Sequence, residues 1–178
     1  MYKKIERFIP VIAAALGVIA IIMFFLPAVI IPATKMGSVT IGEDTVYNGW
    51  QTMFGFFEKA DNGDKIEYLA FTFMNLLTLI LVAAGIVLCV LSFLGKGNKF
   101  FAFIAIACFI VAGVFFFLTV QFAFAGSAYA TNLLGQELSQ AEAKKGWALG
   151  AGPIVGGILS ILAGLVVSVP VVVKLLKK

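Results

Sequence analysis

Residues 38–55 read SVTIGEDTVYNGWQTMFG, and they interrupt a chain that is otherwise almost entirely apolar. β-Branched and aromatic residues flank a Gly42-Glu43-Asp44 turn, which is the pattern of a short β-hairpin. We therefore predict that Ser38–Ile41 pairs antiparallel with Thr45–Asn48. Because an isolated two-stranded hairpin is marginal in water, we expect it to rest on other parts of the chain.

The composition around this stretch is that of a membrane protein. Of 178 residues, 62% are hydrophobic and 12% are charged, which leaves too little polar surface for a soluble domain of this size. The chain has no histidine, and this removes the commonest general base and a frequent metal ligand. We find no serine-nucleophile motif, phosphate-binding loop or metal-ligand cluster, and Cys89 and Cys108 lie in apolar runs where cysteine packs as a small hydrophobe. We predict a protein that is not an enzyme and has no cofactor or metal.

Four apolar runs reach the ~20 residues that a helix needs to cross a bilayer, and none contains a charged residue. They are residues 8–31, 69–94, 100–125 and 150–173, with predicted outer loops at 32–68 and 126–149. The predicted fold class is an all-α integral membrane protein. It is a four-helix transmembrane bundle with a small extracellular β-hairpin in the first outer loop, and residues 1–178 form one membrane domain.

The charges predict the orientation of these spans. Eight basic residues and one acid lie on the side of the two termini and the 95–99 turn, whereas five basic and eight acidic residues lie on the other side. The net charges are therefore +7 and −3. Since basic residues near span ends stay inside, we expect both termini to be cytoplasmic and the protein to reside in the cell membrane. The excess of basic residues is concentrated on the predicted cytoplasmic side of the membrane. We therefore expect the protein to interact with the lipid bilayer and not with nucleic acid.

Two polar side chains stand out within the apolar runs. Counting 1.5 Å per residue from the inner ends of their spans places Asn75 and Gln121 at about the same depth. They are predicted to share a direct or water-bridged hydrogen bond worth ~1 kcal/mol or less. The alternative is that they line a polar path across the membrane.

Small residues recur every four positions along the fourth run. They are Ala148, Gly152, Gly156, Ser160, Gly164 and Ser168. On a helix this spacing makes one groove in which a neighbouring backbone can approach closely. The groove is predicted to pack against the chain's own first or third helix, with Ala13 and Gly17 or Phe115 and Phe116 as counterparts. The alternative is that it binds another protein.

The layout resembles that of claudin-like tetraspan proteins. The shared features are four spans, inner termini, a tight inner turn and a long first outer loop with strands. Claudin first loops carry a Gly-Leu-Trp motif followed by two cysteines; here the match is Gly49-Trp50, and the loop has no cysteine. The chain also looks like small, largely uncharacterised bacterial four-span proteins in which a Gly-Trp-x-x-x-Phe-Gly-like segment, here Gly49 to Gly55, follows a short strand pair.

The function that these features predict is association, either laterally or through the outer loops. The protein would serve in adhesion, as a scaffold, or as an accessory subunit of a membrane complex, bound to another membrane protein or to copies of itself. The outer-loop residues expected to carry association are Val39, Ile41, Tyr47 and Trp50. The alternative is a channel or transporter subunit whose conducting path forms only in an oligomer.

Overall fold

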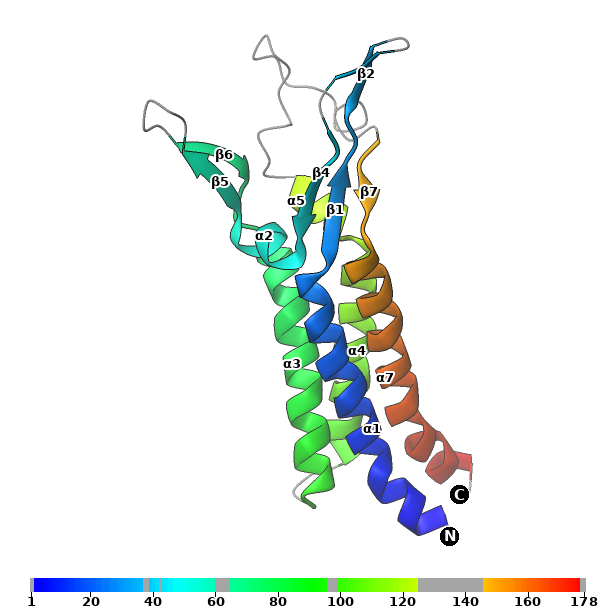
Figure 1. Ribbon diagram of the computed structural model, residues 1–178. Coiled ribbons are helices and arrows are strands. Elements are labelled where there is room, and N and C mark those ends of the chain that lie inside the picture. The colour runs from blue at the N-terminus through cyan, green and yellow to red at the C-terminus, as the bar shows by residue number, and fades with distance from the viewer. Residues whose placement is uncertain are drawn as a thin grey trace. The chain divides into compact units, whose positions relative to one another are not determined.

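The computed structural model describes residues 2–36, 39–41, 43–59, 65–95, 99–124 and 146–176. Seven strands and six helices, besides one short 3₁₀ helix, are defined in this part of the chain (Figure 1). In chain order they are α1 (Tyr2–Ile22), η1 (Met23–Phe25), β1 (Pro27–Ile31), β2 (Thr34–Met36), β3 (Val39–Ile41), β4 (Thr45–Asn48), α2 (Gly49–Phe54), β5 (Phe56–Lys59), β6 (Lys65–Leu69), α3 (Phe73–Phe93), α4 (Lys99–Phe117), α5 (Thr119–Phe124), β7 (Ala148–Leu149) and α7 (Ala151–Leu176).

Four of the described helices are long and apolar enough to cross a membrane. The apolar segments are Phe8–Phe25, Phe73–Phe93, Phe100–Phe117 and Ala151–Val173. Long apolar side chains are exposed on each helix, among them Ile12, Val87, Val114 and Leu165. Lipid tails are the natural surroundings of such side chains, so this is the pattern of a multi-pass membrane protein.

The helices end earlier than the apolar runs on one side. The first run was predicted to be helical to Ile31, but α1 ends at Ile22 and the run continues as η1 and the strand β1. Leu69, the predicted start of the second span, likewise belongs to β6. The third run is broken at Leu118 into α4 and α5. A buried strand and a buried helix have the same apolar composition over a few residues, which is why the ends of the first two spans were misplaced.

The chain divides into two compact units. The helical unit comprises Met1–Met23, Leu77–Phe116 and Val155–Lys178. The strand-containing unit comprises Phe24–Leu76 and Phe117–Ile154. Each unit is built from segments that are far apart in the sequence.

In the helical unit, α4 is packed against three helices through small residues. The ring of Phe109 lies so close to Gly17 of α1 and Gly85 of α3 that an added Cβ would come within 3.0 Å and 2.9 Å of it. Toward α7, a Cβ on Gly113 would lie 3.1 Å from the carbonyl oxygen of Gly157, so these two backbones are in close contact. Without a hydrophobic drive between helices in lipid, such contacts are the main source of helix association.

The strand-containing unit holds one three-stranded sheet, in the order β4-β1-β7, and two strand pairs, β2-β3 and β5-β6. The prediction of a small β-hairpin in the first outer loop is confirmed, because β2 and β3 form one, but the predicted pairing of Val39–Ile41 with Thr45–Asn48 is wrong. Instead β4 pairs with β1, and β3 pairs with β2. Asp44, predicted to lie in a hairpin turn, has an Oδ1 that accepts a hydrogen bond from the Ala33 N–H at 2.9 Å. The missing partner was β1, whose apolar sequence had been assigned to a membrane span.

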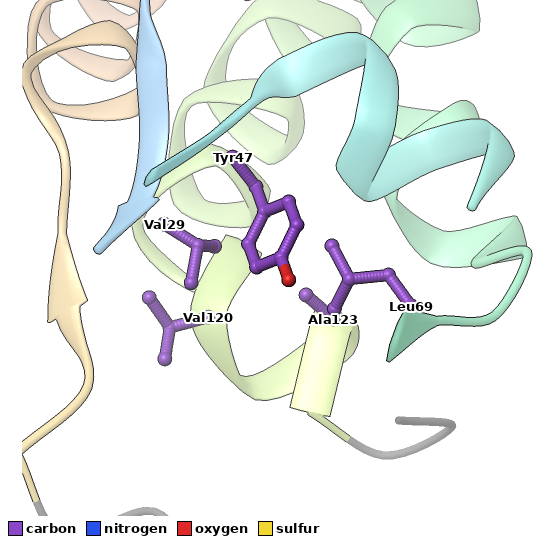
Figure 2. Close-up of a cluster of buried hydrophobic side chains, with 5 residues drawn as sticks. All are labelled: Val29, Tyr47, Leu69, Val120 and Ala123. Carbon is purple, nitrogen blue, oxygen red and sulfur yellow. The ribbon is translucent and has the colours of Figure 1, made fainter. Parts of the chain in front are cut away.

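A small hydrophobic core lies beneath the three-stranded sheet (Figure 2). Tyr47 of β4 projects among side chains of β1, β6 and α5, and the five buried residues are Val29, Tyr47, Leu69, Val120 and Ala123. Partly buried side chains that include Phe56, Tyr68, Trp147 and Leu149 pack around them. Segments that the sequence assigned to both outer loops and to the ends of three spans thus share one core.

Candidate functional site

The segment Asn48–Gly55, which carries the Gly-Trp motif, forms a well-capped short helix. The Asn48 side chain accepts a hydrogen bond from the Gln51 N–H at 2.9 Å, and Gln51 Oε1 accepts one from the Asn48 N–H at 2.9 Å. This reciprocal capping box satisfies two backbone donors at the start of α2. The Thr52 hydroxyl donates to the Gly49 carbonyl at 2.8 Å and is itself buried.

Both glycines of this motif have steric reasons to be glycine. A Cβ on Gly49 would lie 2.6 Å from Phe24 Cδ1 and 2.8 Å from the Phe24 carbonyl oxygen. Gly55 ends the helix with φ +85°, a conformation that side chains disfavour, and a Cβ there would lie 2.7 Å from the Leu69 carbonyl oxygen. The motif is therefore explained by local packing of α2 between η1 and the end of β6.

Trp50 is the centre of an aromatic stack. Its ring lies parallel to that of Phe54 one turn later, with centroids 5.5 Å apart and an interplanar angle of 11°. The ring centroid of Phe25 lies 5.6 Å from that of Trp50. The indole Nε1 is buried and has no hydrogen-bond partner among the described residues, so the polar edge of Trp50 faces inward.

Two hydrogen bonds attach α2 to the start of α3. The Thr72 N–H donates to the Met53 carbonyl at 2.9 Å, and Asn75 Nδ2 donates to the Thr52 carbonyl at 3.1 Å. Asn75 is only 2% exposed. Its side chain satisfies a carbonyl that α2, which ends at Phe54, leaves without an intrahelical partner.

The predicted direct bond between Asn75 and Gln121 does not form. Asn75 donates to Thr52, its Oδ1 is buried without a partner in the described part of the chain, and Gln121 is exposed on α5. The depth estimate assumed two straight helices, whereas α4 ends before Gln121 and α5 turns that side chain outward. The sequence offered no sign that α2 would supply the partner of Asn75.

The predicted outer-loop association residues occupy different environments. Tyr47 is 2% exposed and belongs to the core, so it is not available to a partner and that assignment was wrong. Trp50 is partly buried within its aromatic stack. Val39 and Ile41 lie in β3, and their side chains are outside the described part of the structure. The neighbour of Tyr47, Val46, is exposed instead.

The small-residue groove of α7 faces α4. A Cβ on Gly156 would lie 2.8 Å from the Phe116 ring, the Ser160 hydroxyl donates to the Phe109 carbonyl at 2.9 Å, and Gly164 lies against Ile110. Gly152 is also buried. This is the arrangement that the self-packing interpretation predicts, with Phe116 as one of the two proposed knobs. Ala148, however, belongs to β7 and not to the helix.

No group of three or more histidine, cysteine, aspartate or glutamate side chains gathers in the part of the chain that the structure describes. Glu43, Asp44, Glu58 and Lys59 are exposed. The geometry that distinguishes this molecule is thus a folded strand-containing unit and an uncharged aromatic helix.

Comparison with models of protein families, with curated proteins and with solved structures gives no match to this chain.

Proposed function

We propose that this multi-pass membrane protein is not an enzyme and works by association through its strand-containing unit. Both termini are cytoplasmic in this proposal, and the strand-containing unit faces the outside of the cell. The claudin-like tetraspan architecture is part of the same proposal. The protein would act in adhesion, as a scaffold or as an accessory subunit, with another membrane protein or a second copy as partner.

The observation that carries the proposal is the β4 edge of the three-stranded sheet. Among the strands that the structure describes, β4 is an edge strand of the order β4-β1-β7 and has β1 as its neighbour. Its Tyr47 anchors the strand in the core, while the adjoining Val46 is 48% exposed. A strand that is fixed on one face and lies at the edge of the sheet formed by the described strands favours recognition by strand addition or by side-chain contact.

The α7 groove gives less support to lateral association. Gly156, Ser160 and Gly164 are buried against α4, so a partner would have to displace contacts that the chain already makes. This favours the β4 edge over the groove as the association surface.

A charge on the β4 edge tests the proposal. We expect Val46→Lys to abolish the cross-linked complexes that the tagged protein forms in native membranes, because an edge lysine opposes strand pairing. Glu58→Lys is the matched control, because Glu58 is exposed on the separate β5-β6 pair. Thermal unfolding in detergent should be similar for both variants. If Val46→Lys retains every complex, or if the purified chain alone conducts ions in liposomes, the proposal fails.

The orientation has its own test in intact cells. With Cys89 and Cys108 replaced by alanine, an impermeant thiol reagent should label Glu58→Cys and leave Asn98→Cys unlabelled. Labelling at Asn98 alone would invert the proposed topology.

A further inference from the structure

We propose that α2 is an interfacial helix that lies in the boundary layer of the lipid bilayer and fixes the strand-containing unit to the membrane surface. The exposed rings of Phe25 and Phe54 form the surface that contacts lipid. The inference concerns a different surface from the β4 edge, and it does not depend on any protein partner.

The position of α2 follows from its contacts with the ends of two membrane-spanning segments. The Phe8–Phe25 segment ends at Phe25, and this ring lies 5.6 Å from that of Trp50. The Phe73–Phe93 segment begins one residue after Thr72, whose N–H is bonded to Met53 of α2. Figure 1 shows α2 beside the first turn of α3. A helix in contact with the last residue of one span and the start of another lies at the depth where spans emerge from the bilayer.

The chemistry of α2 suits that depth. Its sequence, GWQTMF, has no charged residue. Tryptophan is enriched at membrane interfaces, and phenylalanine is typical of the apolar face of a helix that lies in the interface. Phe54 is 54% exposed and Phe25 is 64% exposed, while Phe73 in the first turn of α3 is also exposed. Because Trp50 Nε1 points inward, the groups offered to lipid are phenyl rings, which contact acyl chains. Exposed to water, this patch would favour aggregation.

The second tryptophan provides an internal reference for depth. Asn48, directly before α2, is paired with Pro27 at the start of β1, whereas Ala148, directly after Trp147, is paired with Ile30. Three residues along a strand correspond to about 10 Å. Trp147 packs edge-on against Phe124 at 5.2 Å within the strand-containing unit. It should therefore lie farther from the hydrocarbon than Trp50.

Fluorescence quenching by brominated lipids measures this difference. The Trp147→Phe and Trp50→Phe variants each keep one tryptophan, and both are reconstituted into phosphatidylcholine vesicles brominated near the top of the acyl chain. We expect at least about twofold stronger quenching of Trp50 than of Trp147, because a 10 Å offset is a third of the ~30 Å hydrocarbon thickness. Equal quenching of the two tryptophans, or quenching of Trp50 by aqueous acrylamide and not by the lipid, would overturn the inference.

A spin label at Phe54 keeps the inference testable if a tryptophan variant does not fold. In a chain without native cysteines, a nitroxide on Phe54→Cys should collide more often with oxygen, which concentrates in lipid, than with a water-soluble nickel chelate. The matched label on Glu58→Cys, four residues along the chain, should show the opposite preference. A Phe54 label that prefers the chelate would contradict the inference even if the β4 edge were proved to bind a partner.

Discussion

Both units contain glycines in close contact, but they differ in the side chains that gather around those contacts. In the helical unit the closest contacts involve small residues, with Phe109 lying on Gly17 and Gly85 and Phe116 lying on Gly156. In the strand-containing unit the buried cluster is made mainly of larger side chains such as Tyr47 and Leu69. The helical unit exposes many of its aliphatic side chains, such as Ile12 and Leu165, whereas the strand-containing unit gathers Val29, Leu69 and Val120 in one core.

In the proposed arrangement the helical unit meets lipid and the strand-containing unit meets mainly water, and this difference in solvent accounts for the difference in packing. Water drives large apolar side chains into a core, and fully burying one contributes about 2 kcal/mol. Lipid offers apolar surroundings of its own, so helices gain little by hiding a leucine and associate through close backbone packing and a few hydrogen bonds. Substitutions that enlarge a small residue or remove a hydrogen bond should therefore act differently in the two units.

The largest effect is expected at Gly150, in the strand-containing unit. A Cβ there would clash with the Pro27 carbonyl oxygen, and the Gly150 N–H donates to the Ala28 carbonyl at 2.9 Å. The clash is with backbone, which no side-chain rotation relieves. Gly150→Val should lower the free energy of unfolding in detergent by about 3 kcal/mol or more. The exposed neighbour offers the control, Ala151→Val, and equal stability of the two variants would refute the close contact.

In the helical unit, Gly156→Leu is expected to have the next largest effect. The added side chain would meet the Phe116 ring, where even a Cβ lies within 2.8 Å of a ring carbon. Because a ring can shift more readily than a backbone, we expect a loss of about 2 kcal/mol in the monomer. Val155→Leu, at an exposed position, serves as the control. If the monomer keeps its stability while an oligomer or complex dissociates, the groove is an association surface.

The sequence was sufficient for the four long helices. A charge-free run of about 20 apolar residues has few alternatives, because a backbone in hydrocarbon must satisfy its own hydrogen bonds. Much of the groove was also predictable, because Gly156, Ser160 and Gly164 at a four-residue spacing let a neighbouring helix approach closely, although the spacing alone did not distinguish packing within the chain from binding to a partner. Phe116 was named as a counterpart of the groove, and it faces Gly156.

The pairing of the strands could not be predicted from the sequence, because it depends on partners that are distant along the chain. PAVII at Pro27–Ile31 reads equally well as the end of a helix and as a buried strand, and only its pairing with β4 and β7 distinguishes them. The role of Asn75 was hidden for the same reason, since its partner Thr52 is 23 residues away on a helix of six residues. Trp50 and Gly49 drew attention as a motif, but their roles follow from Phe24 and Phe25, which the sequence placed inside a span.

A smaller effect should come from Ser160, the polar member of the groove. Its hydroxyl donates to the Phe109 carbonyl across the α4–α7 contact, whereas the Ser168 hydroxyl donates within its own helix to Leu165. Interhelical hydrogen bonds of this type are worth about 0.6 kcal/mol on average, so Ser160→Ala should cost about that amount and Ser168→Ala close to nothing. Thermal unfolding of the two variants in one detergent measures the difference. A larger cost at Ser168 would contradict the assigned packing face.

The smallest effect is expected in a double-mutant cycle of Asn75 and Gln121, where we expect no coupling energy between the two side chains. Asn75 is buried and bonded to Thr52, while Gln121 is exposed on α5, so the two side chains share no direct bond. Asn75→Leu alone should cost about 1 kcal/mol, because the Thr52 carbonyl loses its donor while an unpartnered Oδ1 is removed at the same time. Gln121→Ala should be nearly neutral, and the double variant should match the sum of the two within about 0.5 kcal/mol. The cycle is measured by chemical or thermal unfolding in detergent.

A coupling energy well above about 0.5 kcal/mol would show that a water molecule joins Asn75 and Gln121, which would restore the polar pair that the sequence predicts. Additivity would instead leave Asn75 with one structural role in the strand-containing unit, holding α2 against the first turn of α3.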